Sequence, residues 1–205
     1  PDVTVRIGGA LKGTYPMLSG EESMVQSYPG VTGGPVEFRS TNGANIIASL
    51  LQFRRPGMTG PWTGITQTMA LTDAQISDVY VIPHYDWSDP KKYNAVQFAN
   101  FDTKPTNVLV EIGGVLMGTY PLDVGESFYA RFSGFTGGPV VVRSDNGAKI
   151  VASLYELKRS ATTGLYTGQT QMMALPWAQL SDTYIIPRYI HHLNDLEPAL
   201  IFAAP

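Results

Sequence analysis

The 205-residue chain has no Cys and three His, so metal binding or catalysis would have to rest on these His and on 17 Asp and Glu. His191-His192 lies close to Asp195 and Glu197, which brings metal-ligand types together, but adjacent residues of a strand point to opposite faces. Asp86 and Asp89 carry oxygens suited to Ca²⁺, but the matching stretch of the repeat described below lacks their spacing. We interpret the histidine segment as a solvated linker and expect no metal and no cofactor.

Patterns typical of enzymes do not occur in the chain. It lacks a G-x-S-x-G elbow, an H-E-x-x-H pair, a Walker loop, a G-x-G-x-x-G loop and an EF-hand loop. A Ser-His-Asp triad is defined by geometry rather than by chain order, and a glycosidase needs only two facing carboxylates. Both stay open as alternatives, and the prediction is that the protein is not an enzyme.

Aromatic residues raise the question of a carbohydrate platform. The chain has 3 Trp and 11 Tyr, and the tryptophans are Trp62, Trp87 and Trp177. We interpret most of them as core or interface residues, because aromatic side chains bury a large apolar area. Surface glycans remain candidate partners.

Composition narrows the class of protein further. Lys and Arg total 14 and Asp and Glu 17, so a net charge of −3 argues against a phosphate backbone as partner, and we expect no nucleic acid. The longest apolar runs, such as 46–51 and 199–204, are far shorter than the roughly 18 residues of a membrane helix, so we expect no membrane span. Few charges together with 21 Gly and 15 Pro favour many short strands and turns.

The chain consists of two copies of one unit. Residues 3–20 match 108–125, and residues 22–85 match 126–189, with 46 identities over the 83 positions from Val3 to Tyr85. Alternating apolar residues in each copy predict strands, Asn42-Gly43 and Asn146-Gly147 predict tight hairpins, and Thr72 with Gln75 predicts one capped helical turn. The predicted fold is all-β: two tandem antiparallel β-sandwich domains of Ig-like or jelly-roll topology.

The ends of the two copies do not match. Residues 95–99, expected to form the opening hairpin of the second domain with 108–112, recur as 199–203 at the C-terminus, whereas the first domain begins directly at Val3. We therefore expect an incomplete first domain at 1–86, a linker at 87–93, a second domain at 94–189, a linker at 190–198 and a donor strand at 199–205. The predicted acceptor strand contains Val3, Val5 and Ile7. The predicted donor residues are Ala199, Leu200, Ile201, Phe202, Ala203 and Ala204.

A sandwich that lacks a strand exposes apolar surface and unpaired backbone groups, which favour pairing with another chain. If the donor strand enters the first domain of the next molecule, the contact is head-to-tail and propagates as a homopolymer. The predicted function is a structural subunit of an extracellular filament, with neighbouring filaments as further candidate partners. Three alternatives remain: closure of the strand onto its own chain, a piece of a longer tandem array, and a monomeric or stalk-embedded adhesin or carbohydrate-binding module.

Three phrases shared by the copies, IGG-x-L-x-GTYP, GGPV-x-x-RS-x-NGA-x-I-x-ASL and Q-[IL]-SD-x-Y-x-IP-x-Y, resemble a tandem β repeat of secreted and surface-exposed bacterial proteins. The resemblance covers nearly the whole chain. It implies a location outside the cell and a structural or adhesive role, and it brings no catalytic residues with it.

Overall fold

The structure is a computed structural model that describes residues 1–17, 23–55, 60, 62–185 and 200–205. These residues form an all-β protein with antiparallel strand pairs throughout and two single 3-10 turns. None of the described helical segments has the length and apolarity needed to cross a membrane. The elements in chain order are β1(Asp2–Ile7), β2(Ala10–Pro16), β3(Val36–Ser40), β4(Ser49–Arg54), β5(Gly64–Met69), η1(Asp73–Gln75), β6(Val79–Ile82), β7(Tyr85–Asp86), β8(Lys92–Asn100), β9(Thr106–Ile112), β10(Val115–Leu122), β11(Ser127–Ala130), β12(Thr136–Gly137), β13(Val140–Ser144), β14(Ile150–Arg159), β15(Tyr166–Met173), β16(Leu175–Pro176) and η2(Trp177–Gln179).

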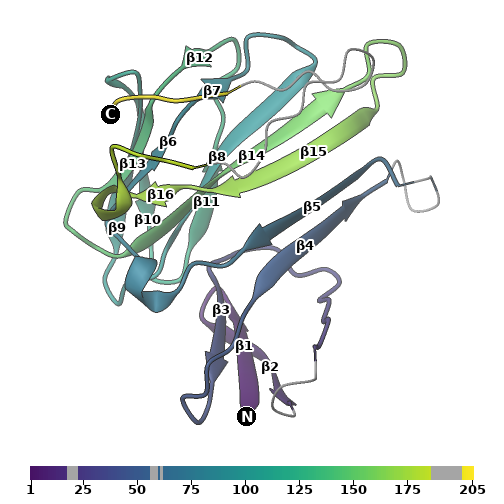
Figure 1. The fold of residues 1–205 in the computed structure, drawn as a ribbon, viewed down its shortest axis with the longest axis vertical. Coiled ribbons are helices and arrows are strands. Elements are labelled where there is room, and N and C mark those ends of the chain that lie inside the picture. The colour runs from purple at the N-terminus through teal and green to yellow at the C-terminus, as the bar shows by residue number, and fades with distance from the viewer. Residues whose placement is uncertain (18–22, 56–59, 61, 186–199) are drawn as a thin grey trace.

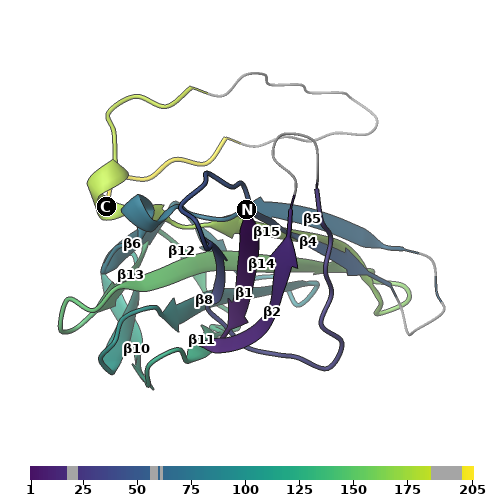
Figure 2. The ribbon, with the colours of Figure 1, turned by 90° about the horizontal axis from the view of Figure 1, so that it is seen from below.

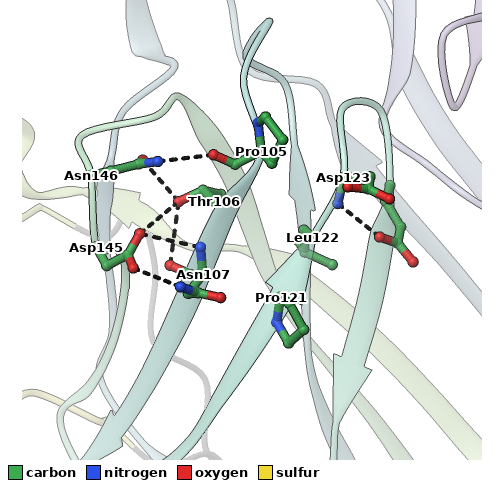
Figure 3. A pocket seen from close by; sticks show the side chains of 9 residues that line it. Pro105, Thr106, Asn107, Pro121, Leu122, Asp123, Asp145 and Asn146 are labelled. Carbon is green, nitrogen blue, oxygen red and sulfur yellow. Dashed lines mark hydrogen bonds between the residues drawn. The ribbon is translucent and has the colours of Figure 1, made fainter.

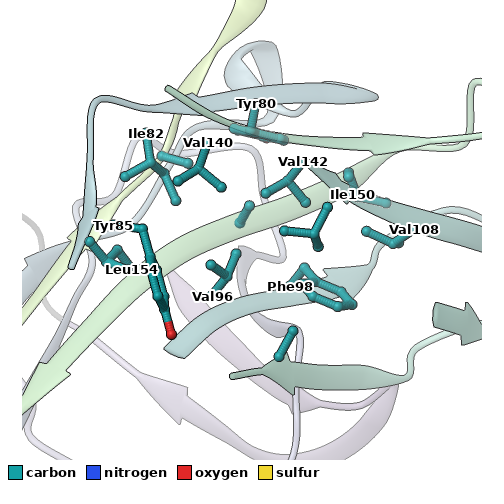
Figure 4. Close-up of a cluster of buried hydrophobic side chains, with 14 of the residues drawn as sticks. Tyr80, Ile82, Tyr85, Val96, Phe98, Val108, Val140, Val142, Ile150 and Leu154 are labelled. Atoms are coloured by element: carbon teal, nitrogen blue, oxygen red, sulfur yellow. The ribbon is translucent and has the colours of Figure 1, made fainter. Parts of the chain in front are cut away.

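Residues 77–180 form the larger part of the molecule, which we call the two-sheet body (Figure 1). One sheet has the strand order β10-β9-β13-β6-β16 and the other β11-β8-β14-β15. Both sheets supply side chains to one apolar core, in which Val108, Val142 and Tyr80 face Phe98 and Ile150 (Figure 4). Strand alternation explains this core, because every second residue of β9 points inward and is buried.

β7 and β12 form a separate two-stranded sheet within the two-sheet body. The strands before η1 form two further small sheets, β2-β1-β3 and β4-β5, which we call the N-terminal sheets. The β4–β5 hairpin runs beside the edge strand β15 of the body (Figures 1 and 2). There the Thr68 hydroxyl donates to the carbonyl of Gln171 at 3.2 Å, and the amide of Gln171 donates to Thr66 Oγ1 at 3.2 Å. Side chains, rather than a continuous backbone ladder, therefore join the N-terminal sheets to the body along this edge.

The predicted Asn-Gly hairpins are wrong. The strands on either side of Asn146-Gly147 belong to opposite sheets, since β13 pairs with β9 and β6 while β14 pairs with β8 and β15. Among the described residues only Gly has positive φ, so the two positive-φ positions of a type I′ turn are not met. Asn146 instead accepts a hydrogen bond from the amide of Ala148 at 3.0 Å through Oδ1, and Asn42 does the same for Ala44 at 3.1 Å. Asn-Gly thus forms the corner between two sheets.

The boundary expected at 86/87 also differs from the structure. β6 and β7, placed by the sequence in the first domain, pair with β13 and β12 of the two-sheet body. The expected linker 87–93 is tied to the body as well, because the amide of Trp87 donates to the Phe135 carbonyl at 2.8 Å and Lys92 already begins β8. The expected opening hairpin is wrong, since β8 and β9 lie in different sheets. The linker expected at 190–198 lies outside the described residues.

The capped turn near Thr72 is confirmed. Asp73–Gln75 forms a 3-10 turn, and Gln75 Oε1 accepts hydrogen bonds from the amide of Thr72 at 2.9 Å and from its hydroxyl at 3.0 Å. In the second copy Pro176 precedes the equivalent turn η2.

Candidate functional site

The N-terminal sheets repeat parts of the two-sheet body in the same register. Val5 lies opposite Phe38 just as Val110 lies opposite Val142 at the equivalent positions. Ser49 lies opposite Met69 in the β4–β5 pair, as Ser153 lies opposite Met173 in the β14–β15 pair. The arrangements β2-β1-β3 and β4-β5 therefore correspond to β10-β9-β13 and β14-β15.

Three strands of the second copy have no counterpart among the described residues of the first. They are β11, β12 and β16, and the residues equivalent to them at 23–26, 32–33 and 71–72 are not in strands. Each of the three pairs with a strand of the segment 79–100: β11 with β8, β12 with β7 and β16 with β6. The described residues of the first copy therefore contain no equivalent of the three strands that pair with the segment 79–100 in the second copy.

Exposure changes at the same repeat positions. Val140, Ile150 and Leu154 are buried in the core, with at most 3% of each residue exposed. Their counterparts Val36, Ile46 and Leu50 are 45%, 38% and 45% exposed. In the second copy these residues pair with β6 and β8. Their counterparts in the first copy are therefore apolar residues that are exposed to solvent.

The segment 79–100 provides much of the core that it covers. Of the 16 buried residues in the core cluster, five come from it: Tyr80, Ile82, Tyr85, Val96 and Phe98. Two of these also carry buried hydroxyl groups that are satisfied: Tyr80 donates to the Gln75 carbonyl at 3.1 Å, and Tyr85 donates to the Asn94 carbonyl at 3.0 Å. Burial raises the pKa of both tyrosines to about 12.

The predicted donor residues are solvent-exposed in this structure. Leu200, Ile201 and Phe202 are 61%, 59% and 90% exposed, whereas Val96 and Phe98, the counterparts of Leu200 and Phe202, are at most 2% exposed. Ala203 and Ala204 are exposed as well, and residues 200–205 form no strand. Ala199 lies outside the described residues.

The predicted acceptor strand corresponds to β1, and here the structure corrects the expectation. Both edges of β1 are already paired, one with β2 and the other with β3. Val3 and Val5 are buried and Ile7 is half-buried. A donated strand therefore has no free backbone edge at β1. In the part of the chain that the structure describes, no strand lies beside one edge of β3 and one edge of β4. These edges correspond to the edge of β13 that pairs with β6 and the edge of β14 that pairs with β8.

The arginines shared by the two copies, Arg39 with Arg143 and Arg55 with Arg159, take part in local contacts. Arg143 donates to Glu111 Oε1 at 2.9 Å, and Arg39 contacts Glu37 at 2.7 Å. Arg159 lies over the ring of Tyr166 at 4.9 Å. Among the described members of this set, these contacts support structural roles at strand ends.

The carboxylates that lie near a surface hollow are used by the fold. Figure 3 shows this hollow, of about 480 Å³, beside β9 and β10. Asp145 accepts from the side-chain amide of Asn107 at 2.8 Å and from its backbone amide at 3.2 Å, and these bonds lower the pKa of Asp145. Glu126 accepts from the amide of Asp123 at 2.8 Å. Within the described ranges, no group of three or more His, Asp and Glu side chains is placed to hold a metal.

The tryptophans do not gather on one face. Trp87 packs against the core and lies 5.0 Å from the ring of Tyr93. Trp62 and Trp177 are about half exposed, but the start of β5, two residues after Trp62, and the turn η2 lie at opposite sides of the molecule (Figures 1 and 2).

Sequence reasoning missed that β6 belongs to the two-sheet body, where it pairs with β13. The shared phrase Q-[IL]-SD-x-Y-x-IP-x-Y covers 75–85 and 179–189, and it was assigned to the end of each domain. Strand alternation is the same whichever sheet a strand joins, so this signal identified the strand but not its partner.

No protein-family model, curated protein or solved structure matches the chain.

Proposed function

We propose that the protein is the structural subunit of an extracellular, pilus-like filament, which polymerises head-to-tail when the C-terminal strand of one chain inserts into the N-terminal sheets of the next. The observation that carries the proposal is that the strands missing from the first copy are those that pair with 79–100 in the second. The chain carries a second version of that segment at its C-terminal end, and the described part of it is exposed.

The positions of donor and acceptor favour exchange between chains. The C-terminus lies at the opposite end of the longest axis from β1, β2 and β3 (Figure 1). A contact between two different surfaces of the same molecule is heterologous, and it generates an open polymer unless a rotation closes it into a ring. If the chain is one part of a longer array, the same contact joins consecutive repeats.

Chemistry supports a durable contact. Burying Leu200 and Phe202 contributes about 1.5 to 3 kcal/mol for each side chain, and each ladder hydrogen bond adds about 1 kcal/mol. Association costs on the order of 4 to 15 kcal/mol, so these gains are of the same size as the cost. Release requires the ladder hydrogen bonds to break and both apolar side chains to return to water together, which makes dissociation slow. A location at the cell surface and a role in adhesion are part of the proposal and rest on the repeat resemblance.

The test compares the mass of the folded full chain, by light scattering, with that of a Leu200→Asp, Phe202→Asp double variant. The full chain should form multimers that grow with concentration, and the double variant should remain monomeric. Val115→Asp is the matched control, because Val115 is 57% exposed on β10 and lies outside the proposed contact, so this variant should assemble. A folded full chain that stays monomeric contradicts the proposal, and glycan binding by that monomer would favour the adhesin alternative.

A further inference from the structure

We propose that each chain donates two strands, residues 183–185 and 200–204, one to each of the two N-terminal sheets of its neighbour. This inference rests on the proposed function and specifies its contact. The first donated strand would add to the free edge of β3, and the second to the free edge of β4. The acceptor partner is thus a second copy of this chain, in a defined register.

The two-sheet body provides the template for both strands. β6 pairs with β13, with Tyr80 opposite Val142, and β8 pairs with β14, with Phe98 opposite Ala152. Moving these pairs to the equivalent positions of the repeat places Tyr184 opposite Phe38 and Phe202 opposite Ala48. The spacing between the two strands also agrees. Val81 and Val96 are separated by as many residues as their counterparts Ile185 and Leu200.

Residues 183–185 have the character of a strand without its partner. Tyr184 and Ile185 are 62% and 89% exposed, whereas their counterparts Tyr80 and Val81 are buried. In the body, β6 fills the edge of β13 and contributes Tyr80 and Ile82 to the core. Without an equivalent strand, Val36 and Phe38 remain exposed on β3.

The turn that leads into this strand is already formed in the C-terminal copy. The amide of Ser181 donates to the Tyr184 hydroxyl at 2.9 Å, as the amide of Ser77 donates to the Tyr80 hydroxyl at 3.1 Å. The amide of Thr183 donates to Ser181 Oγ at 3.1 Å, as the amide of Val79 donates to Ser77 Oγ at 3.3 Å. The local geometry that precedes β6 therefore occurs twice, and only one of the two following segments is paired within the described residues.

The acceptor hairpin shows a matching feature for the second strand. Gln67 donates to Ser49 Oγ at 2.9 Å, and its counterpart Gln171 donates to Ser153 Oγ at 3.3 Å. In the body Ser153 also donates to Gln97 of β8 at 3.3 Å, directly across the strand pair. The position equivalent to Gln97 is Ile201, which has no hydrogen-bonding side chain, so the comparison supplies the register, Ser49 opposite Ile201, and no shared hydrogen bond.

Cysteine cross-linking tests both strands in the full chain, which has no Cys of its own. One variant combines Arg39→Cys with Thr183→Cys, the positions that correspond to the Arg143–Val79 pair of the body. The other combines Ser49→Cys with Ile201→Cys, the positions that correspond to the Ser153–Gln97 pair. Directly opposite residues of an antiparallel pair have Cα atoms about 4.5 to 5.5 Å apart, within the roughly 4.4 to 6.8 Å that a disulfide spans, so mild oxidation can join them. Both variants should give covalent ladders on a non-reducing gel.

The controls exchange the partners between the two variants. Arg39→Cys with Ile201→Cys, and Ser49→Cys with Thr183→Cys, place the thiols on opposite sheets about 10 Å apart, so these chains should run as monomers. A further variant tests the first strand at a second position, in case one substitution disturbs folding. It combines Glu37→Cys with Ile185→Cys, the positions that correspond to the Val141–Val81 pair of the body.

The outcomes separate this inference from the proposed function. Ladders from the Ser49 variant but not from either variant of the first strand overturn the two-strand donor and leave filament formation intact. Disulfides confined within monomers show closure onto the same chain and overturn both proposals. Ladders from the exchanged pairs overturn the register.

Discussion

Phe98 and Phe202 occupy the same position of the repeat in opposite surroundings. Phe98 is 2% exposed and packs in the core between the two sheets, whereas Phe202 is 90% exposed. The same residue type is thus buried in a core at one position and exposed to solvent at the other. The pair allows the burial of one side chain to be measured against its own matched control.

We expect Phe98→Ala to lower the free energy of unfolding of the monomer by about 3 to 5 kcal/mol, the usual cost of removing a buried Phe. Phe202→Ala should leave this free energy unchanged and weaken assembly instead. Urea denaturation of dilute protein measures the first effect, and light scattering measures the second. Equal destabilisation of the monomer by both variants would show that Phe202 packs within its own chain.

Asp86 gives the body an acid-sensitive contact. Lys92 donates to its carboxylate, Ser88 adds its hydroxyl and its amide, and together these bonds hold the pKa of Asp86 well below its ordinary value. Because the folded pKa is lowered, the contact stabilises the fold above the ordinary Asp pKa of about 3.9, and this stability is lost as the pH falls through the folded value.

Asp86→Asn should therefore destabilise the body at neutral pH and have a smaller effect in acid. Urea denaturation at about pH 7 and about pH 3, on either side of the ordinary pKa, measures the difference. A difference between wild type and variant that stays constant between the two conditions would contradict the role of this ion pair.

At the scale of elements, the repeat predicted which residues form strands far better than which strands pair. The alternation of Val108, Val110 and Ile112 is what a half-buried strand requires, and β9 forms there. Val79–Ile82 could join a sheet formed by residues earlier in the chain or one formed by residues later in the chain. The choice depends on contacts between residues distant in sequence, which the alternation of apolar residues does not predict. The Asn-Gly prediction failed for a related reason, since a turn residue describes the bend and not the sheet that the next strand joins.

For the same reason, the sequence predicted the donor segment of the candidate site but not its acceptor edge. Comparing the ends of the two copies identified 199–205 as a spare segment, because this comparison needs no knowledge of pairing. Choosing Val3, Val5 and Ile7 as acceptor assumed that neighbours in sequence are neighbours in the sheet. The structure places β8 beside β14 instead, so the equivalent free edge is that of β4.

A synthetic peptide of residues 181–205 should act as a chain terminator when added in excess to the full-length protein. By occupying the edges of β3 and β4 it competes with the donor segment of the next chain, and the mean polymer mass should fall as its concentration rises. A peptide with Asp at the positions of Leu200 and Phe202 is the control and should have no effect. Sedimentation velocity measures the mass distribution, and equal effects of the two peptides would contradict specific strand insertion.

At the scale of the whole molecule, the proposal is that the first copy receives from another chain a segment that the second copy obtains from its own chain. The body is complete because 79–100 supplies β6, β7 and β8 to it. If each repeat receives these strands from the repeat before it, neighbouring repeats along a filament are joined in the same way within a chain and between chains. A filament with nearly equivalent consecutive repeats follows.

Electron cryomicroscopy of the assembled full chain tests this most directly, through a map that resolves individual strands. We predict density for residues 200–204 along the outer edge of β4, and this density should be continuous with the body of the preceding subunit. An outer edge of β4 that is vacant in the polymer, or that is covered by residues of its own chain, would contradict the account.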